Sequence, residues 1–83
     1  MGAPNELRVV LLTLGARIRE LRMAQGMTQE AAAAASGIDY KRWQRLEAGA
    51  VNPTVQTLVR VADALGLSVW TVVEGPRNAR GDA

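Results

Sequence analysis

Four polar side chains, spaced to share one face of a short helix, carry the most specific chemistry in this sequence. Lys41 and Arg45 are four residues apart, and Tyr40 and Gln44 lie beside them. Residues at this spacing are neighbours on a helix surface. Lysine or arginine can donate hydrogen bonds to O6 and N7 of guanine, and glutamine can bond adenine through both amide atoms. We therefore predict that these four side chains contact the edges of bases.

A second group of side chains is suited to phosphate oxygens. Thr28 and Gln29 stand at the start of a predicted helix, where free backbone N–H groups favour an anion. Arg42 flanks the base-reading face and could bind either a phosphate or Glu20. We predict Thr28, Gln29 and Arg42 as phosphate contacts. The alternative for all these cations is an ordinary solvated helix face, and for Tyr40 a position over the core.

The composition argues against catalysis and metal binding. The 83 residues contain no Cys and no His, so thiolate and imidazole chemistry are absent. The carboxylates are not clustered, and no nucleophile–base pair is recognisable. We expect no enzyme activity, no cofactor and no metal. The net charge is only +2, so the positions of the nine arginines are more informative than the net charge of the chain.

Capping residues, glycines and apolar periodicity predict five helices and no strand. The predicted N-caps are Asn5, Thr28, Asp39, Thr54 and Ser68, and the helices end near Gly26, Gly37, Gly49, Gly66 and Glu74. The second and third helices are short, and the bend between them at Gly37 has the spacing of a helix-turn-helix.

The same periodicity predicts which side chains are buried. The apolar stripe of the first helix is Leu7, Leu11, Leu14, Ile18 and Leu21, and that of the fourth is Val55, Leu58, Val61, Ala62 and Leu65. Trp43 and Leu46 turn the third helix toward the core, which leaves Lys41, Gln44 and Arg45 outside. We assign Trp43 and Trp70 to the core rather than to base stacking. Gly15 lies within the first helix, where two explanations are open. Either the long helix tolerates a glycine there, or another helix approaches closely at this position.

Several separated motifs together resemble one family. The stretch from Leu14 to Val69 resembles the phage repressor and Cro-type helix-turn-helix family, also called the xenobiotic-response-element family. The motifs are IRELR, GMTQE, the turn glycine Gly37, RLEAG, NPT and ADALGLSV. The resemblance implies an all-α, five-helix lambda-repressor-like DNA-binding domain whose third helix, about 39–48, enters the major groove. We place this domain at 5–74, after a flexible lead-in (1–4) and before a disordered tail (75–83).

The resemblance also implies roles for individual residues. Gln29 matches a phosphate-contacting glutamine, and the four residues of the predicted base-reading face match base-contacting positions. Arg22 and Glu47 match a structural ion pair between the first helix and the end of the third. The chain departs from the family at Ala32, where a large aliphatic residue is usual, and at Trp43, where a smaller one is usual. We expect Trp43 to fill the volume that Ala32 leaves.

These observations predict a sequence-specific double-stranded DNA-binding transcriptional regulator, of repressor type, in the cytoplasm and associated with the nucleoid. No apolar run is long enough to span a membrane. A DNA-binding protein this small is expected to bind as a homodimer to a pseudo-palindromic operator with half-sites about 34 Å apart. The candidate dimer interface consists of Val9, Leu12, Ala16, Trp70 and Val73. The alternative is a protein-interaction module, such as an antitoxin or adaptor, on the same fold.

Overall fold

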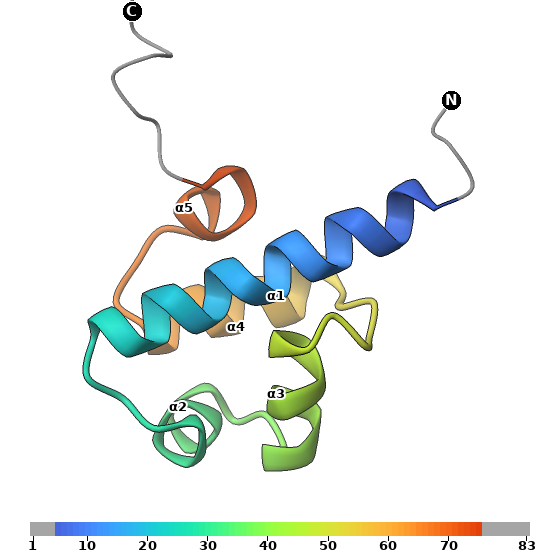
Figure 1. Ribbon diagram of the computed structural model, residues 1–83. Coiled ribbons are helices and arrows are strands. Elements are labelled where there is room, and N and C mark those ends of the chain that lie inside the picture. Colours follow the sequence, from blue (N-terminus) through green and yellow to red (C-terminus); the bar gives the residue numbers. More distant parts are fainter. Residues whose placement is uncertain (1–4, 76–83) are drawn as a thin grey trace, which may run out of the picture.

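The computed structural model describes residues 5–75, and within this range the chain forms five helices joined by short loops (Figure 1). They are α1 (Glu6–Ala24), α2 (Gln29–Ser36), α3 (Tyr40–Glu47), α4 (Val55–Ala64) and α5 (Val69–Glu74). No strand occurs within these residues, so the expected all-α, five-helix class is confirmed. None of the five helices is long and apolar enough to cross a membrane. The predicted lead-in (1–4) and the predicted tail from residue 76 onward lie outside the described residues.

Local capping explains where four of the five helices begin. The side-chain oxygens of Thr28, Asp39, Thr54 and Ser68 each accept a hydrogen bond from a backbone N–H of the first turn, at 3.0–3.2 Å. Such bonds satisfy N–H groups that have no partner inside the helix. Asn5 occupies the N-cap position of α1 without a side-chain capping bond.

The bend between α2 and α3 depends on the backbone conformation of Gly37. Its φ is +70° and its ψ is 23°, in the left-handed region that side-chain-bearing residues rarely adopt. The N–H of Ile38 then donates to the carbonyl oxygen of Ala33 at 3.0 Å, which closes the end of α2. Nothing lies within 4 Å of a Cβ built at Gly37, so conformation and not space requires glycine here.

One apolar core joins all five helices. Its largest fully buried side chains are Trp43, Ile18, Val61 and Val72, contributed by α3, α1, α4 and α5. Ala32 of α2 is also fully buried in this cluster. The large Trp43 of α3 and the small Ala32 of α2 are therefore buried in the same core. This arrangement is consistent with the expectation that Trp43 fills the volume that Ala32 leaves.

The C-terminal end of α3 packs directly on the middle of α1 (Figure 1). A Cβ added to Gly15 would lie 2.5 Å from the carbonyl oxygens of both Leu46 and Glu47. Another Cβ, at Gly49, would lie 2.9 Å from Cα of Leu12. Of the two readings of Gly15, the close approach of another helix is therefore the right one. Two glycines let α3 dock against the backbone of α1.

Three predicted core positions are wrong. Trp70 is 64% exposed because Val72, two residues later on the opposite side of α5, takes the buried position. Val55 is 73% exposed because it is the first residue of α4, and Leu58, one turn later, makes the core contact. Leu7 is exposed because the first turns of α1 extend past the rest of the bundle (Figure 1).

A side chain of α1 holds α5 in place. Nη1 of Arg17 donates hydrogen bonds to the carbonyl oxygens of Val72 and Val73, at 3.1 and 3.0 Å. These carbonyls lie in the last turn of α5, where a cation also interacts favourably with the helix dipole. Gly75, the first residue of the predicted tail, is buried, and its N–H donates to the carbonyl oxygen of Thr71.

Candidate nucleic-acid interface

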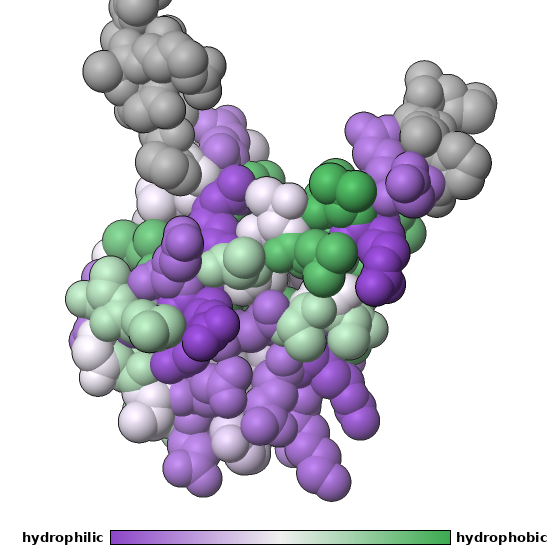
Figure 2. Space-filling model, in the orientation of Figure 1, coloured by the Kyte–Doolittle hydropathy of each residue, from purple (hydrophilic) through white to green (hydrophobic). Residues whose placement is uncertain are grey.

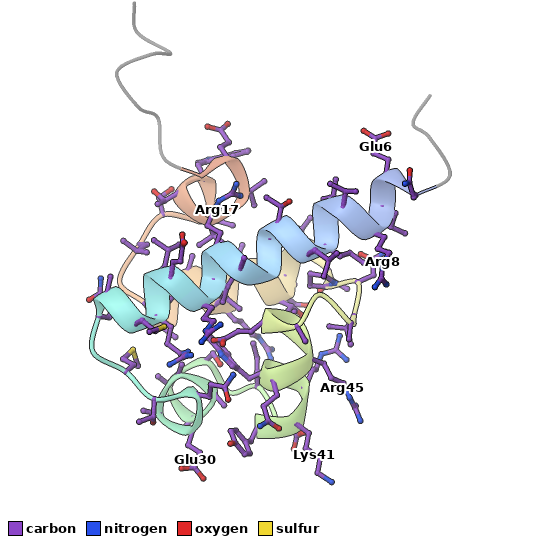
Figure 3. All side chains as sticks on the ribbon, in the orientation of Figure 1. Glu6, Arg8, Arg17, Glu30, Lys41 and Arg45 are labelled. Carbon is purple, nitrogen blue, oxygen red and sulfur yellow. The ribbon has the colours of Figure 1, made fainter. Side chains whose placement is uncertain are left out.

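The outer face of α3 is polar and open to solvent. Lys41, Gln44 and Arg45 are exposed, and Tyr40 is 40% exposed. Figure 3 shows the side chains of Lys41 and Arg45 pointing away from the bundle. The end of the molecule formed by α2 and α3 is largely hydrophilic (Figure 2). The structure thus places the four predicted base-reading residues on one accessible surface, and Tyr40 does not lie buried over the core.

Two of these four residues are bonded to each other. The amide nitrogen of Gln44 donates to the hydroxyl of Tyr40 at 3.2 Å, one helical turn earlier. The Gln44 amide retains its oxygen and one N–H for a ligand, and the tyrosine hydroxyl can still donate. Both ends of this pair therefore remain able to form hydrogen bonds with a base edge.

The three predicted phosphate contacts have different surroundings. The hydroxyl oxygen of Thr28 caps α2 by accepting from the N–H of Ala31. Arg42 is exposed and, within residues 5–75, forms no ion pair with Glu20. Gln29 is half-buried, and its amide nitrogen donates to Oε1 of Glu47 at 2.9 Å. Thr28 and Arg42 are thus at the surface, whereas Gln29 is tied to the scaffold.

Arg22 and Glu47, predicted as a structural pair, are joined through two bonds. Nε of Arg22 lies 2.5 Å from Oε2 of Glu47, and Nη2 lies 3.1 Å from Oε1. The side chains are only 11% and 4% exposed. Nη1 of Arg22 also donates to the carbonyl oxygen of Met27, at 2.8 Å. The pair therefore links α1, the residue before the α2 cap and the last residue of α3.

The Glu47 carboxylate receives four hydrogen bonds in all. Besides the two from Arg22 and the one from Gln29, the indole Nε1 of Trp43 donates to Oε2 at 2.6 Å. Trp43 and Gln29 were not predicted as donors to Glu47. A signal for Trp43 was present, because a buried indole N–H needs an acceptor and Glu47 follows four residues later on the same helix.

This network keeps both members of the ion pair charged. Burial raises the pKa of the Glu47 carboxyl, but the hydrogen bonds from Arg22, Trp43 and Gln29 and the Arg22 charge outweigh it, so the pKa lies below its ordinary value. The hydrogen bond to Glu47 raises the pKa of Arg22 above its ordinary value, although burial opposes this. No side-chain nitrogen or oxygen buried within residues 5–75 lacks a hydrogen-bond partner. The orientation of α3 is therefore set by a complete polar network.

Apolar side chains gather along the N-terminal half of α1, away from the outer face of α3 (Figure 2). Val9 and Val73 line one open groove there, between α1, α5 and the loop at Pro53. Leu12 and Ala16 line a second hollow on α1. Trp70 lines neither, although it is exposed. Four of the five predicted interface residues thus line two neighbouring surfaces, one on α1 and one shared by α1 and α5.

Two short helices joined at a left-handed glycine, with the second helix exposed along one face, define a helix-turn-helix. The sequence profile of the helix-turn-helix domain matches residues 13–72. The chain belongs to this family, which confirms the resemblance seen in its motifs.

Relatives and solved structures agree with this assignment. The HTH-type transcriptional regulator y4dJ of Sinorhizobium fredii is 44% identical over 55 residues, 66% of this chain and 71% of that protein. The restriction-modification controller protein C.AhdI from Aeromonas hydrophila has a TM-score of 0.74 and 34% identity, covering 75% of this chain and 94% of the other. Two structures of the clp gene regulator ClgR from Corynebacterium glutamicum have a TM-score of 0.75 and 32% identity, covering 78% of this chain and 83% or 69% of the other.

Other curated relatives are longer. The chain spans 46% of the regulator DdrOP3 of Deinococcus deserti and 31% of the regulator PuuR of Escherichia coli.

Proposed function

We propose that the protein is a sequence-specific double-stranded DNA-binding transcriptional regulator, of repressor type, that reads the major groove with α3. The observation that carries this proposal is the division of α3 into two faces. Trp43 and Leu46 are buried, and Lys41 and Arg45 point into solvent on the other side (Figure 3). A helix so anchored presents donors that fit guanine, with Gln44 and Tyr40 beside them for adenine or a second base.

Phosphate contacts set the register of α3 on the duplex. Thr28 and Arg42, both exposed, and Gln29, at the start of α2, are the residues that we assign to them. These contacts carry no sequence information, but they govern the salt dependence of binding. The proposed mechanism uses no cofactor and no catalytic group. We infer a location in the cytoplasm with the nucleoid, because duplex DNA is the proposed ligand.

A homodimer would supply the second recognition helix. We assign its interface to Val9, Leu12, Ala16, Trp70 and Val73, because all five residues are apolar and exposed. The folding unit that dimerises is residues 5–74. Two-fold symmetry then requires a pseudo-palindromic operator with half-sites about 34 Å apart.

Selection of bound duplexes from a random pool tests the proposal. We expect enrichment of a pseudo-palindromic sequence, and an observed association constant that falls steeply as salt rises. Repression is tested separately, by placing the selected sequence over a promoter that drives a reporter. A pool that shows no enrichment, together with binding that does not respond to salt, would overturn the assignment.

The open apolar groove beside Val9 and Val73 supports a second candidate function. A protein-interaction module, such as an antitoxin or adaptor, would bind a protein partner there. Binding to that partner would depend little on salt and would survive Lys41→Ala and Arg45→Ala. The loss of all specific binding in these two variants would favour the DNA-reading function instead.

A further inference from the structure

An apolar groove of about 430 Å³ opens between the N-terminal half of α1, α5 and the loop that joins α3 to α4. Its lining is apolar except for Thr13, Asn52 and Arg17. Leu7 and Val10 of α1, which line it, are 56% and 51% exposed. Figure 2 shows apolar side chains gathered on this part of α1. Small-ligand sites usually measure about 300–1,000 Å³ and combine an apolar lining with a few polar groups, so the groove has the size and composition of such a site.

Arg17 is the only charged residue among the described residues that line this groove. Its guanidinium is held in place, since Nη1 donates to the carbonyl oxygens of Val72 and Val73. A Cβ built at Gly75 would lie 2.6 Å from Nε of Arg17, so the backbone of Gly75 also packs closely on this group. Figure 3 shows the Arg17 side chain between α1 and α5. The position of the cation is therefore set before any ligand binds.

Two nitrogens of Arg17, Nε and Nη2, have no hydrogen-bond acceptor within residues 5–75. No buried side-chain nitrogen in this range lacks a partner, so both atoms are accessible to solvent. No carboxylate of these residues lies within ion-pair distance of the Arg17 guanidinium. The edge formed by Nε and Nη2 matches the two oxygens of a carboxylate, and Arg22 uses the same edge to bind Glu47. Arg17 can therefore accept one anionic group from a ligand.

An apolar groove with one such cation fits a molecule that has an apolar body and a single negative charge. The apolar body would remove the exposed side chains of Leu7, Val10 and Val73 from water. A carboxylate brings one negative charge to the one cation, whereas a phosphate monoester brings about 1.5 to 2. A wholly apolar ligand would leave Nε and Nη2 of Arg17 covered and without an acceptor, which is costly. The chemistry of the lining therefore favours an amphipathic carboxylate.

We propose that this groove binds a small carboxylic acid with an aliphatic chain, whose carboxylate pairs with Arg17 and whose chain lies along Leu7, Val10 and Val73. Val9 and Val73 line the groove and also belong to the proposed dimer interface, so the bound molecule covers part of that interface and opposes dimerisation. This effect on the dimer rests on the proposed function, whereas binding of the carboxylate does not. One domain would then carry both the DNA-reading helix and the site for a regulating ligand.

The first test titrates octanoate into the full chain and follows the backbone amide signals by NMR. We expect saturable shifts confined to α1, α5 and the loop at Pro53. Affinity should rise from butanoate to octanoate by up to about fourfold for each buried methylene. 1-Octanol, which carries no charge, should bind about tenfold more weakly than octanoate. Equal affinities of the alcohol and the acid would indicate an apolar face that suits a protein or a second copy of this chain, and would overturn the proposal.

The charge of the groove is tested at Val10, because a substitution of Arg17 would also remove its bonds to α5. Val10 is exposed and outside the proposed dimer interface, so Val10→Glu and Val10→Lys should both fold. Both lose the same apolar contact, but only the glutamate repels a carboxylate. We expect Val10→Glu to bind octanoate about tenfold more weakly than Val10→Lys. Val59→Glu is the matched control, because Val59 is similarly exposed on α4 and does not line the groove. Equal affinities of the two Val10 variants, or a loss in Val59→Glu as large as that in Val10→Glu, would refute the proposal.

Sedimentation and gel-shift experiments test the effect on the dimer. Octanoate at a saturating concentration should convert the wild-type dimer to monomer and release the selected duplex, and Val10→Glu should resist both effects. Octanoate that binds in the groove but leaves the dimer intact would overturn the regulatory role. A wild type that selects no duplex but binds octanoate would overturn the DNA-reading function and support the carboxylate site.

Discussion

The indole nitrogen of Trp43 donates a hydrogen bond to Glu47, one turn later on α3, over a distance of 2.6 Å. Trp43 is also the largest fully buried side chain of the core. One residue therefore fills the core and secures the carboxylate that pairs with Arg22. Since both contacts lie on the inner side of α3, they fix the rotation of the helix about its axis. That rotation sends Lys41 and Arg45 outward.

Removal of the Glu47 carboxylate should destabilise the fold strongly. Glu47→Ala leaves the Arg22 guanidinium, only 11% exposed, without its partner, at a cost of about 3 kcal/mol in the free energy of unfolding. Urea unfolding followed by circular dichroism measures this loss. Glu20→Ala removes an exposed carboxylate from α1 and should change stability by less than about 0.5 kcal/mol. Similar losses in the two variants would refute the structural role of the network.

Acid should weaken the fold through the same group. The pKa of Glu47 is lower in the folded protein than in the unfolded chain. The unfolded state therefore binds more protons between the two values, and stability rises with pH in that window. The contribution is fully present above the ordinary glutamate pKa, about 4.3, and is lost as pH falls through the folded value. Unfolding midpoints from pH 7 to pH 3 should fall less steeply for Glu47→Gln than for the wild type. Parallel curves would contradict this.

Gly15 should not tolerate even a methyl group. A Cβ there would lie 2.5 Å from two carbonyl oxygens of α3, and these are backbone atoms that cannot turn aside. We expect Gly15→Ala to cost about 1–3 kcal/mol of stability by overpacking. That loss would occur although alanine is favoured over glycine within a helix by about 1 kcal/mol. A thermal midpoint equal to or above that of the wild type would show that α1 and α3 can separate without loss.

Base reading and phosphate binding should separate by mutation. Arg45→Ala removes a donor from the outer face of α3, so the sequence preference should relax at one position of each half-site, by about 1–3 kcal/mol of discrimination. Gln29→Ala should weaken binding to all sequences alike. Gel-shift titration against single-base variants of the selected duplex measures both effects. An unchanged base preference in Arg45→Ala would remove this residue from the reading surface.

The apolar surface of α1 should control self-association. Leu12→Glu places a charge in the proposed dimer interface, where its desolvation is costly, so the variant should sediment as a monomer at concentrations where the wild type is a dimer. Val59→Glu is a suitable control, because Val59 is 46% exposed and Leu12 is 44% exposed, and Val59 is outside the proposed interface. A wild type that is monomeric at every concentration, or a control that dissociates equally, would refute the assigned interface.

Features that arise within one helical turn follow from the order of the residues. Helix starts at Thr28, Asp39, Thr54 and Ser68 come from a side chain that bonds an N–H two or three residues later. The bend at Gly37 reflects a backbone angle that glycine adopts without steric cost. The exposed set on α3 follows from the burial of Trp43 and Leu46 together with helical periodicity. Such interactions span few residues, so a reader of the sequence can evaluate them directly.

The exposure of Trp70 and the hydrogen bonds to Glu47 depend instead on how the helices pack against one another. The exposure of Trp70 could not be read from its spacing, because it depends on which side of α5 faces α1 and α4. The donors on Glu47 come from three helices, across separations of up to 25 residues. The energy of such contacts depends on distances and burial that arise when the chain closes into its core. For that reason a local pattern predicted α3 and its exposed face, and assembly of the bundle created the network that orients this helix.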